Sequence, residues 1–357
     1  MRNDGEVADS RLVATPGQWW QGARPRTLPA AIAPVLVGTA TAYYSLSVVL
    51  RSHGWFAYSP AGAIASQPVA SSGTFSGQSD VTDIPALAGA HASLTLGEMG
   101  VRALLALVVA LALQVGVNYA NDYSDGIRGT DDARVGPVRL VGQGLASARR
   151  VRLAAFTSFG VAALAGLALV LLTHAWWLLL VGLAAIVAAW FYTGGPRPYG
   201  YAGLGELFVF VFFGLVAVSG STYVQTLEIT WLAVAGGVAC GALSVAILLA
   251  NNLRDIPTDS DVGKHTLAVR MGDHGTRMAY LLAVAAPFVV AVAVAIPDLP
   301  WALTGLLALP LAVQPVRMIR SGALGRDLVP VLAGTGRLLL GYAVALSIGL
   351  VAAAVTR

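Results

Sequence analysis

Charged side chains are scarce in this sequence. Asp, Glu, Lys and Arg together make up 11% of its 357 residues, whereas 57% of the residues are hydrophobic. Because a soluble domain carries about 25% charged residues, this composition excludes a molecule whose whole surface faces water. The sequence therefore predicts a polytopic membrane protein that places apolar surface in lipid.

Cysteine is nearly absent, and a cleavable leader is not recognisable. The single Cys240 lies inside an apolar run, which excludes a disulfide framework within the chain. Residues 1–20 are polar and of mixed charge, without a short apolar core and a small-residue cleavage site, so we expect no cleavable signal peptide. They are expected to form a cytoplasmic tail ahead of a membrane domain over residues 21–357.

Long apolar runs are abundant. A spanning helix needs roughly 20 residues, and nine runs come close to that length, at 27–49, 101–120, 152–172, 176–193, 204–222, 232–252, 279–296, 300–316 and 337–355. The predicted fold class is an all-α bundle of nine transmembrane helices. Residues at about 50–98 are rich in Ser, Gly, Ala and Pro, and we expect them to form a flexible extracytoplasmic loop.

The positions of Lys and Arg give this bundle an orientation. With the N-terminus in the cytoplasm, all but three of the 22 Lys and Arg residues fall in cytoplasmic segments, and the exceptions are Arg51, Arg102 and Arg357. The positive-inside rule therefore predicts a plasma-membrane protein with its N-terminus inside and its C-terminus outside. This distribution also explains the formal net charge of +4 without nucleic acid as a partner.

The first of two polar clusters follows the second apolar run, on the predicted cytoplasmic side. Asn118, Asp122 and Asp125 are spaced i, i+4 and i+7. They share one face if the helix continues beyond the apolar run. A further acid, Asp131, comes shortly afterwards.

The second polar cluster follows the sixth apolar run, on the same side of the membrane. Asn251, Asp255 and Asp259 are spaced i, i+4 and i+8, again roughly on one face. Pro257 lies between the two acids and disfavours helix at Ile256, so the helix is predicted to kink or end there.

The chemistry of these clusters points to a metal and a phosphorylated ligand. Carboxylates gathered at the end of a low-dielectric bundle repel one another unless a cation neutralises them. Mg²⁺ is typically held by one or two carboxylates and completes its shell with water and phosphate oxygens. Two facing clusters are therefore expected to hold Mg²⁺ on a diphosphate. Basic side chains close to the clusters can bind the remaining anionic oxygens: Arg128, Arg139, Arg254 and Lys264. The competing interpretation is that the acids are solvated turn and capping residues.

The stretches that carry these clusters, 118–139 and 251–267, resemble the two Asp-rich motifs of the UbiA superfamily of intramembrane prenyltransferases. They are most similar to the 1,4-dihydroxy-2-naphthoate polyprenyltransferases, as are 23–29 and 192–206. The resemblance runs from about residue 18 to the end, except near 50–98. In the superfamily pattern NDxxDxxxD, Gly129 stands at the third Asp position and the next acid is Asp131, which favours the naphthoate subgroup over the 4-hydroxybenzoate branch.

The resemblance implies a nine-helix bundle, a reaction and a cofactor. A polyprenyl group would pass from polyprenyl diphosphate to 1,4-dihydroxy-2-naphthoate with loss of CO₂ and diphosphate, giving demethylmenaquinone in menaquinone biosynthesis. Mg²⁺ would be held by the catalytic acids of both motifs, Asp122, Asp125, Asp255 and Asp259, with Asn118 and Asp131 as further ligands. Diphosphate would be bound by Arg139 and Lys264, with Arg128 and Arg254 nearby.

The sequence offers several candidates, but no fixed motif, for the residues that contact the aromatic acceptor and the allylic cation. Arg24 or Arg26 is a candidate partner for the naphthoate carboxylate, although both also fit as positive-inside anchors. Aromatic residues at cytoplasmic helix ends are candidates to face the allylic cation or to anchor the interface: Tyr119, Tyr123, Tyr192 and Tyr199. Glu206 is a functional candidate as an intramembrane carboxylate, or a helix–helix hydrogen-bonding group. Asn118 is a further candidate for the substrate site.

Other functions remain as alternatives. A CDP-alcohol phosphatidyltransferase also combines Asp clusters with a divalent metal, but its D-G-x-x-A-R block does not continue after Asp125 and Gly126. A cation-coupled transporter places its charged sites near the bilayer midplane, often within inverted repeats, whereas these clusters lie at helix ends. Within the superfamily, the alternative is another aromatic acceptor such as 4-hydroxybenzoate or a chlorin.

Overall fold

The computed structural model describes residues 14–52, 95–129, 138–297 and 299–356, and every regular element within these ranges is a helix. Asp131 and most of the predicted loop at about 50–98 lie outside the described residues. The elements are α1 (Pro16–Gly22), η2 (Pro25–Thr27), α2 (Pro29–Ser52), α4 (Leu96–Ile127), α5 (Ala148–Thr173), α6 (Leu178–Phe191), η3 (Tyr199–Ala202), α7 (Gly205–Val209), η4 (Phe210–Val216), α8 (Ala217–Thr226), α9 (Trp231–Asp261), α10 (Leu267–Ala295), η5 (Pro300–Ala308), α11 (Leu309–Arg320), η6 (Gly325–Leu328) and α12 (Val329–Thr356).

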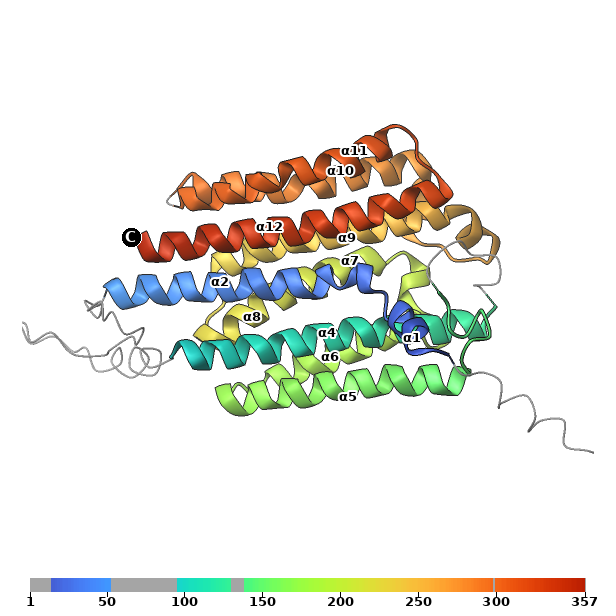
Figure 1. The fold of residues 1–357 in the computed structure, drawn as a ribbon, viewed down its shortest axis with the longest axis horizontal. Helices are drawn as coiled ribbons and strands as arrows, with labels where there is room; N and C mark the ends of the chain where they lie inside the picture. Colours follow the sequence, from blue (N-terminus) through green and yellow to red (C-terminus); the bar gives the residue numbers. More distant parts are fainter. Residues whose placement is uncertain (1–13, 53–94, 130–137, 298, 357) are drawn as a thin grey trace, which may run out of the picture.

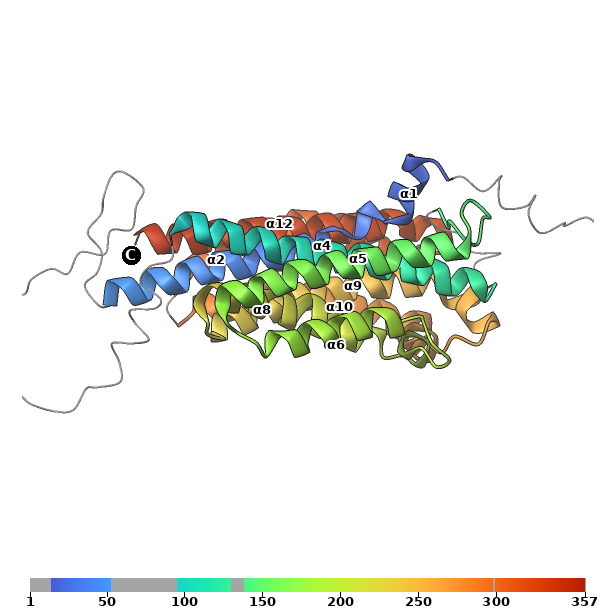
Figure 2. The same ribbon diagram turned by 90° about the horizontal axis from the view of Figure 1, so that it is seen from below.

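The long helices lie side by side along the longest axis of the molecule (Figures 1 and 2). Eight helical segments among the described residues are long and apolar enough to cross a membrane. The remaining predicted segment, at 176–193, corresponds to α6, which has 14 residues. At 1.5 Å per residue it is about 21 Å long, shorter than the roughly 30 Å hydrocarbon core. The predicted all-α, polytopic fold class is confirmed.

The outer surface of the bundle is apolar, as lipid contact requires. Leu164, Leu180 and Leu282 are 70%, 71% and 65% exposed. Soluble proteins rarely expose contiguous apolar surface of this kind. The chain is therefore a multi-pass membrane protein.

Two helices continue beyond the apolar runs, and the sequence-based interpretation of the first polar cluster assumed such a continuation. α4 continues past the apolar run to Ile127, and α9 continues to Asp261, so both polar clusters lie within helices. The sequence predicted that α9 would kink or end near Pro257, and the helix does not end there. Beside the proline, Thr258 Oγ1 donates a hydrogen bond to the Asp255 carbonyl at 3.0 Å.

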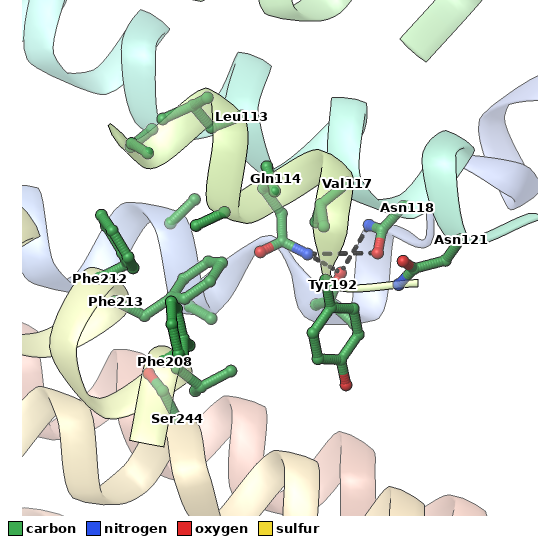
Figure 3. Close-up of a pocket in the computed structure, with 18 of the residues that line it drawn as sticks. Leu113, Gln114, Val117, Asn118, Asn121, Tyr192, Phe208, Phe212, Phe213 and Ser244 are labelled. Carbon is green, nitrogen blue, oxygen red and sulfur yellow. Dashed lines mark hydrogen bonds between the residues drawn. The ribbon is translucent and has the colours of Figure 1, made fainter. Parts of the chain in front are cut away.

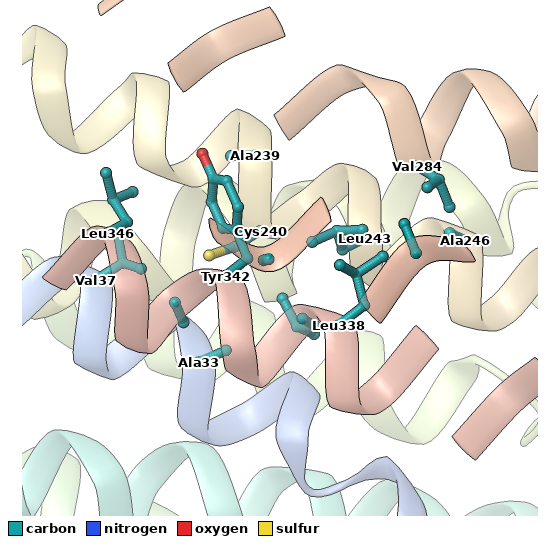
Figure 4. Close-up of a cluster of buried hydrophobic side chains, with 14 of the residues drawn as sticks. Ala33, Val37, Ala239, Cys240, Leu243, Ala246, Val284, Leu338, Tyr342 and Leu346 are labelled. Atoms are coloured by element: carbon teal, nitrogen blue, oxygen red, sulfur yellow. The ribbon is translucent and has the colours of Figure 1, made fainter. Parts of the chain in front are cut away.

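The core is built around α9, which packs against α10, α12, α2 and η4. Cys240 and Leu243 of α9 are fully buried and meet Leu338 and Tyr342 of α12 in one apolar cluster (Figure 4). The Tyr342 hydroxyl donates to the Pro287 carbonyl at 2.9 Å, so its one polar atom is satisfied within the core.

A close backbone contact fixes the π-helical element η4 against α9. A Cβ atom at Gly214 would lie 2.5 Å from both the Gly237 carbonyl oxygen and the Gly241 Cα. Small residues of this kind allow two helix backbones to approach closely inside a membrane. The contact holds η4 with its aromatic residues at the cavity described below.

The polar clusters that the sequence singled out lie at one end of the bundle, as far as the described residues show. The ends of α4 and α9, together with α1 and the start of α5, gather there, while the chain's C-terminal end lies at the opposite end (Figure 1). The expectation that the two Asp clusters lie on the same side of the membrane is met by this arrangement.

Candidate active site

One large cavity of about 1450 Å³ runs between α2, α4, α5, α6 and the η4–α8 segment. Most of its wall is apolar, from Val35, Ala106 and Val224 at one end to Leu113 and Val117 nearer the polar segments. Phe208, Phe212 and Phe213 line it opposite Gln114 (Figure 3). Charged and amide side chains line its other end: Arg24, Arg26, Asn118, Asn121, Asp125, Arg139, Arg254, Asp259 and Lys264.

Asp125 is the centre of the polar end. It is 3% exposed, on the last turns of α4. Its Oδ1 accepts hydrogen bonds from the Tyr201 hydroxyl at 2.7 Å and from Lys264 Nζ at 3.1 Å. Its Oδ2 lies 4.0 Å from an Arg139 guanidinium nitrogen. Two cations and a hydroxyl thus surround one buried carboxylate, as its desolvation requires.

Tyr201 reaches this carboxylate from η3, in the loop between α6 and α7. A Cβ at Gly200 would lie 2.5 Å from the Tyr192 carbonyl, and Gly203 has a φ of 77°, so two glycines allow the tight path of this loop. The Tyr201 carbonyl accepts a hydrogen bond from the His265 amide, next to Lys264. Burial, followed by the adjacent Asp125 charge, raises the pKa of Tyr201 above its usual range, which keeps the hydroxyl protonated.

Asp122 has a different environment from Asp125, although both lie on α4. Its Oδ2 accepts from the Leu140 amide at 2.8 Å and its Oδ1 from the Val141 amide at 3.0 Å. The side chain is 1% exposed and does not line the cavity. Asp122 therefore holds the loop that carries Arg139.

In the second cluster, too, one acid lines the cavity and the other is hydrogen-bonded away from it. Asp255 accepts two hydrogen bonds from Arg254, at 2.7 and 2.8 Å, and Arg254 also donates to Asn251 at 2.9 Å. Asp259 lines the cavity, whereas Asp255 does not. The Asp259 carbonyl accepts from the Lys264 amide at 2.8 Å, which ties the end of α9 to the lysine.

Among the described acids that the sequence assigned to a metal, Asp125 and Asp259 line the cavity, whereas Asp122 and Asp255 do not. Within the described ranges, no three His, Cys, Asp or Glu side chains come together as a metal cluster. Two acids, Asp125 and Asp259, line the same cavity as Lys264 and Arg139. Two carboxylates with room for phosphate oxygens are the donor set that Mg²⁺ typically takes, so these residues fit a metal that binds together with a diphosphate.

Asn118 lies in an amide network next to the cavity (Figure 3). Its Nδ2 donates to the Ala23 carbonyl at 2.8 Å and to Thr27 Oγ1 at 3.1 Å, and Gln114 Nε2 donates to the same hydroxyl at 2.9 Å. This network joins η2 to α4. It places Arg24, whose φ is 55°, and the following Arg26 at the edge of the cavity.

The remaining sequence candidates separate into those at the cavity and those outside it. Tyr192 and Tyr199 line the cavity. Arg128 donates to the carbonyls of Thr193 and Gly195 instead. Side chains that do not line the cavity are also occupied elsewhere: Glu206 accepts from Asn252 at 2.9 Å, Tyr119 donates to the Trp19 carbonyl at 2.9 Å, and Tyr123 stacks on Trp190.

The sequence-based prediction missed several residues at the site, three of which join its hydrogen-bond network. Tyr201 contacts Asp125 across 76 positions, Thr193 Oγ1 donates to Asn121 at 2.8 Å, and Gln114 joins the Asn118 network. No periodicity links these residues to the acidic clusters. The only signal was that Thr193 and Tyr201 lie in the stretch 192–206, which matched the naphthoate subgroup.

Comparison with known proteins agrees with this geometry. The chain is 49% identical over 337 residues to the 1,4-dihydroxy-2-naphthoate octaprenyltransferase of Mycobacterium tuberculosis (strain ATCC 25618 / H37Rv), covering 94% of this chain and 97% of that protein. It is 35% identical to the 1,4-dihydroxy-2-naphthoate octaprenyltransferase of Escherichia coli (strain K12), covering 72% of this chain and 70% of that protein.

Solved structures share the fold. A UbiA homolog from Archaeoglobus fulgidus bound to GPP and Mg²⁺ superimposes with a TM-score of 0.53 at 14% identity, covering 92% of this chain and 99% of that one. The apo structure of a UbiA homolog from Aeropyrum pernix K1 gives 0.52 at 14% identity, covering 89% and 97%. The model of the UbiA prenyltransferase family matches residues 83–328, and this chain belongs to that family.

Proposed function

We propose that this protein transfers a polyprenyl group from polyprenyl diphosphate to 1,4-dihydroxy-2-naphthoate, the demethylmenaquinone-forming step of menaquinone biosynthesis. One observation carries the proposal: a single cavity is apolar along most of its length and ends at Asp125, Asp259, Arg139 and Lys264. Such a cavity suits a ligand with a long hydrocarbon tail and a diphosphate head. The naphthoate acceptor is supported by the names of the relatives that cover nearly the whole chain.

The donor's diphosphate is proposed to bind at the polar end. Lys264 and Arg139 both lie at Asp125 and face the same space. Mg²⁺ bound with the diphosphate would supply charge neutralisation on the leaving group. Asp125 and Asp259 are its proposed protein ligands. Asp122, Asp255, Asn118 and Asp131 complete the wider set predicted from the sequence, and Arg254 and Arg128 remain as more distant counter-charges.

Cleavage of the allylic C–O bond leaves a cation on the prenyl group, and the electron pair of that bond stays with the diphosphate oxygen. Lys264 and Arg139 are positioned to stabilise the developing negative charge. The apolar wall excludes water that would capture the cation. Tyr192 and Tyr199 line this part of the cavity and offer π faces to the cation.

The acceptor is proposed to enter beside Arg24 and Arg26, where a guanidinium can pair with its carboxylate. The electron-rich ring attacks the cation at the carbon that bears the carboxylate. A carbon–carbon bond forms, CO₂ leaves with the carbon–carbon bond electrons returning to the ring, and the aromatic diol is restored. This diol is the reduced form of demethylmenaquinone.

The cavity's polar end is proposed to face the cytoplasm. In the topology predicted from the sequence, all Lys and Arg residues except Arg51, Arg102 and Arg357 belong to segments on the side of the Asp clusters, which is the positive-inside pattern. Residues 1–20 would then be a cytoplasmic tail, and the membrane domain would cover 21–357 with the segment at about 50–98 outside.

One assay tests the reaction. Purified protein in lipid vesicles would be given Mg²⁺, octaprenyl diphosphate and 1,4-dihydroxy-2-naphthoate labelled with ¹⁴C in its carboxyl group. The expected result is release of labelled CO₂ that matches the formation of prenylated product and requires the donor. Transfer to 4-hydroxybenzoate without release of CO₂ from the naphthoate would overturn the proposed acceptor.

A further inference from the structure

Tyr201 lies between the acid and the base at the polar end of the cavity. Its hydroxyl donates to Asp125 Oδ1 at 2.7 Å. The ammonium of Lys264, which donates to the same oxygen, sits 4.4 Å from the centroid of the Tyr201 ring. One side chain therefore contacts both members of the buried ion pair, through its hydroxyl and through its π face.

The ring of Tyr201 also faces a second cation. The guanidinium carbon of Arg128 lies 5.3 Å from the ring centroid. Arg128 belongs to the end of α4 and donates to the carbonyls of Thr193 and Gly195. Cation–π contacts in partly desolvated surroundings stabilise such pairs, so the ring helps to fix the loop 192–204 against α4.

The backbone of Tyr201 is fixed to the lysine segment as well. Its carbonyl accepts from the His265 amide at 3.0 Å, and the preceding Lys264 amide is bound to the Asp259 carbonyl. A Cβ at Gly203 would lie 3.2 Å from the His265 carbonyl oxygen. Tyr201 therefore connects three segments that are distant in sequence: the end of α4, the loop 192–204 and the loop after α9.

We infer that Tyr201 is a positioning residue for diphosphate binding, which orients the Asp125 carboxylate with its hydroxyl and holds the Lys264 ammonium with its ring. The inference rests on the proposed diphosphate site. Without the hydroxyl, Asp125 loses this 2.7 Å hydrogen bond and can rotate toward Lys264 or Arg139. The lysine is then drawn away from the position from which it meets the diphosphate.

Two substitutions separate the hydroxyl from the ring. Tyr201→Phe keeps the π face and removes the hydrogen bond, whereas Tyr201→Leu removes both. We expect Tyr201→Phe to weaken binding of inorganic diphosphate in the presence of Mg²⁺ about tenfold, corresponding to ~1.4 kcal/mol, with a similar rise in KM for polyprenyl diphosphate and kcat within about threefold of the parent. Tyr201→Leu should weaken binding further.

The matched control is Tyr280→Phe. Tyr280 is fully buried on α10, its hydroxyl is hydrogen-bonded to Thr335 at 2.6 Å, and it does not line the cavity. It therefore reports the effect of losing a buried tyrosine hydroxyl away from the site. Binding would be measured by isothermal titration calorimetry with inorganic diphosphate and Mg²⁺, which requires neither acceptor nor turnover.

The possible results are distinct. Weaker diphosphate binding by Tyr201→Phe, with Tyr280→Phe unchanged, supports the positioning role. Unchanged binding by Tyr201→Phe, or an equal loss in both phenylalanine variants, would overturn it. Absence of diphosphate binding by the parent protein would instead refute the proposed function itself, and the role of Tyr201 with it.

Discussion

Lys264 Nζ lies 3.1 Å from Asp125 Oδ1, although the two residues are 139 positions apart. This ion pair joins the end of α4 to the loop after α9 at the polar end of the cavity. A buried pair of this kind stabilises little by itself, because desolvation of both charges opposes their attraction. Its position at the polar end of a large, mostly apolar cavity is better explained by a role in ligand binding than by a contribution to stability.

The first prediction concerns the Asp125 carboxylate. Asp125→Asn keeps the size of the side chain and removes its charge, so Lys264 loses its partner and the proposed metal loses a ligand. We expect kcat/KM for prenyl transfer to fall on the order of 100-fold or more, measured by release of diphosphate. Asp273→Asn is the control, because Asp273 pairs with Arg277 on α10 and does not line the cavity. Near-parental activity of Asp125→Asn would contradict the assignment.

Asp122 should behave differently from Asp125, because its two oxygens accept the amides of Leu140 and Val141. Asp122→Ala leaves the buried Leu140 amide and the partly buried Val141 amide without their acceptor, and a buried unsatisfied group costs about 1–3 kcal/mol. We expect a clearly lower Tm in detergent even without Mg²⁺ and substrate. Asp273→Ala, which removes a carboxylate that is 53% exposed, should change the Tm much less. Equal Tm values for the two variants would show that Asp122 has no role in holding the loop.

A third prediction follows from the small number of carboxylates at the cavity. Since Asp125 and Asp259 are the acids that line it among the described residues, Mg²⁺ alone should bind weakly. Mg²⁺ and inorganic diphosphate together should raise the Tm, because a ligand at 100 times its Kd stabilises by about 2.7 kcal/mol. A chelator should reverse the effect. An equal shift with Mg²⁺ alone would indicate a preformed metal cluster.

The sequence was sufficient for the fold and for part of the site. Hydropathy located all nine helical segments, because lipid-facing helices are apolar over most of their surface, as the exposed Leu164 and Leu180 show. The i, i+4, i+7 spacing placed Asp122 and Asp125 on one helix end. The spacing could not distinguish the environments of the two acids. Asp122 accepts hydrogen bonds from two amides of a loop, and the path of that loop depends on tertiary packing.

Sequence periodicity could not predict the contacts between segments that are distant in the chain. Tyr201 reaches Asp125 only because Gly200 and Gly203 allow a tight loop beside the end of α4. A tyrosine near a helix end is compatible with interface anchoring as well as with a role at a site. The sequence pattern did not single out Tyr201, and its contact with Asp125 appears only in the structure.

The last prediction concerns the depth of the cavity. Gly214 of η4 touches Gly237 and Gly241 of α9, and a Cβ at Gly214 would lie 2.5 Å from backbone atoms of both. Gly214→Ala must push η4 away from α9, at a cost of about 1–3 kcal/mol. Because Phe212 and Phe213 of η4 line the cavity, this displacement narrows the space for a prenyl chain.

The substitution should lower kcat/KM more for long prenyl donors than for short ones. We expect Gly214→Ala to lower kcat/KM for octaprenyl diphosphate several-fold more than for geranyl diphosphate, measured side by side in the same vesicles. Gly160→Ala is the control, since a Cβ there meets nothing within 4 Å and Gly160 does not line the cavity. If Gly214→Ala lowered both rates equally, its effect would be one of stability alone. The difference between the two donors therefore tests whether the glycine contact beneath η4 sets the length of chain that the cavity accepts.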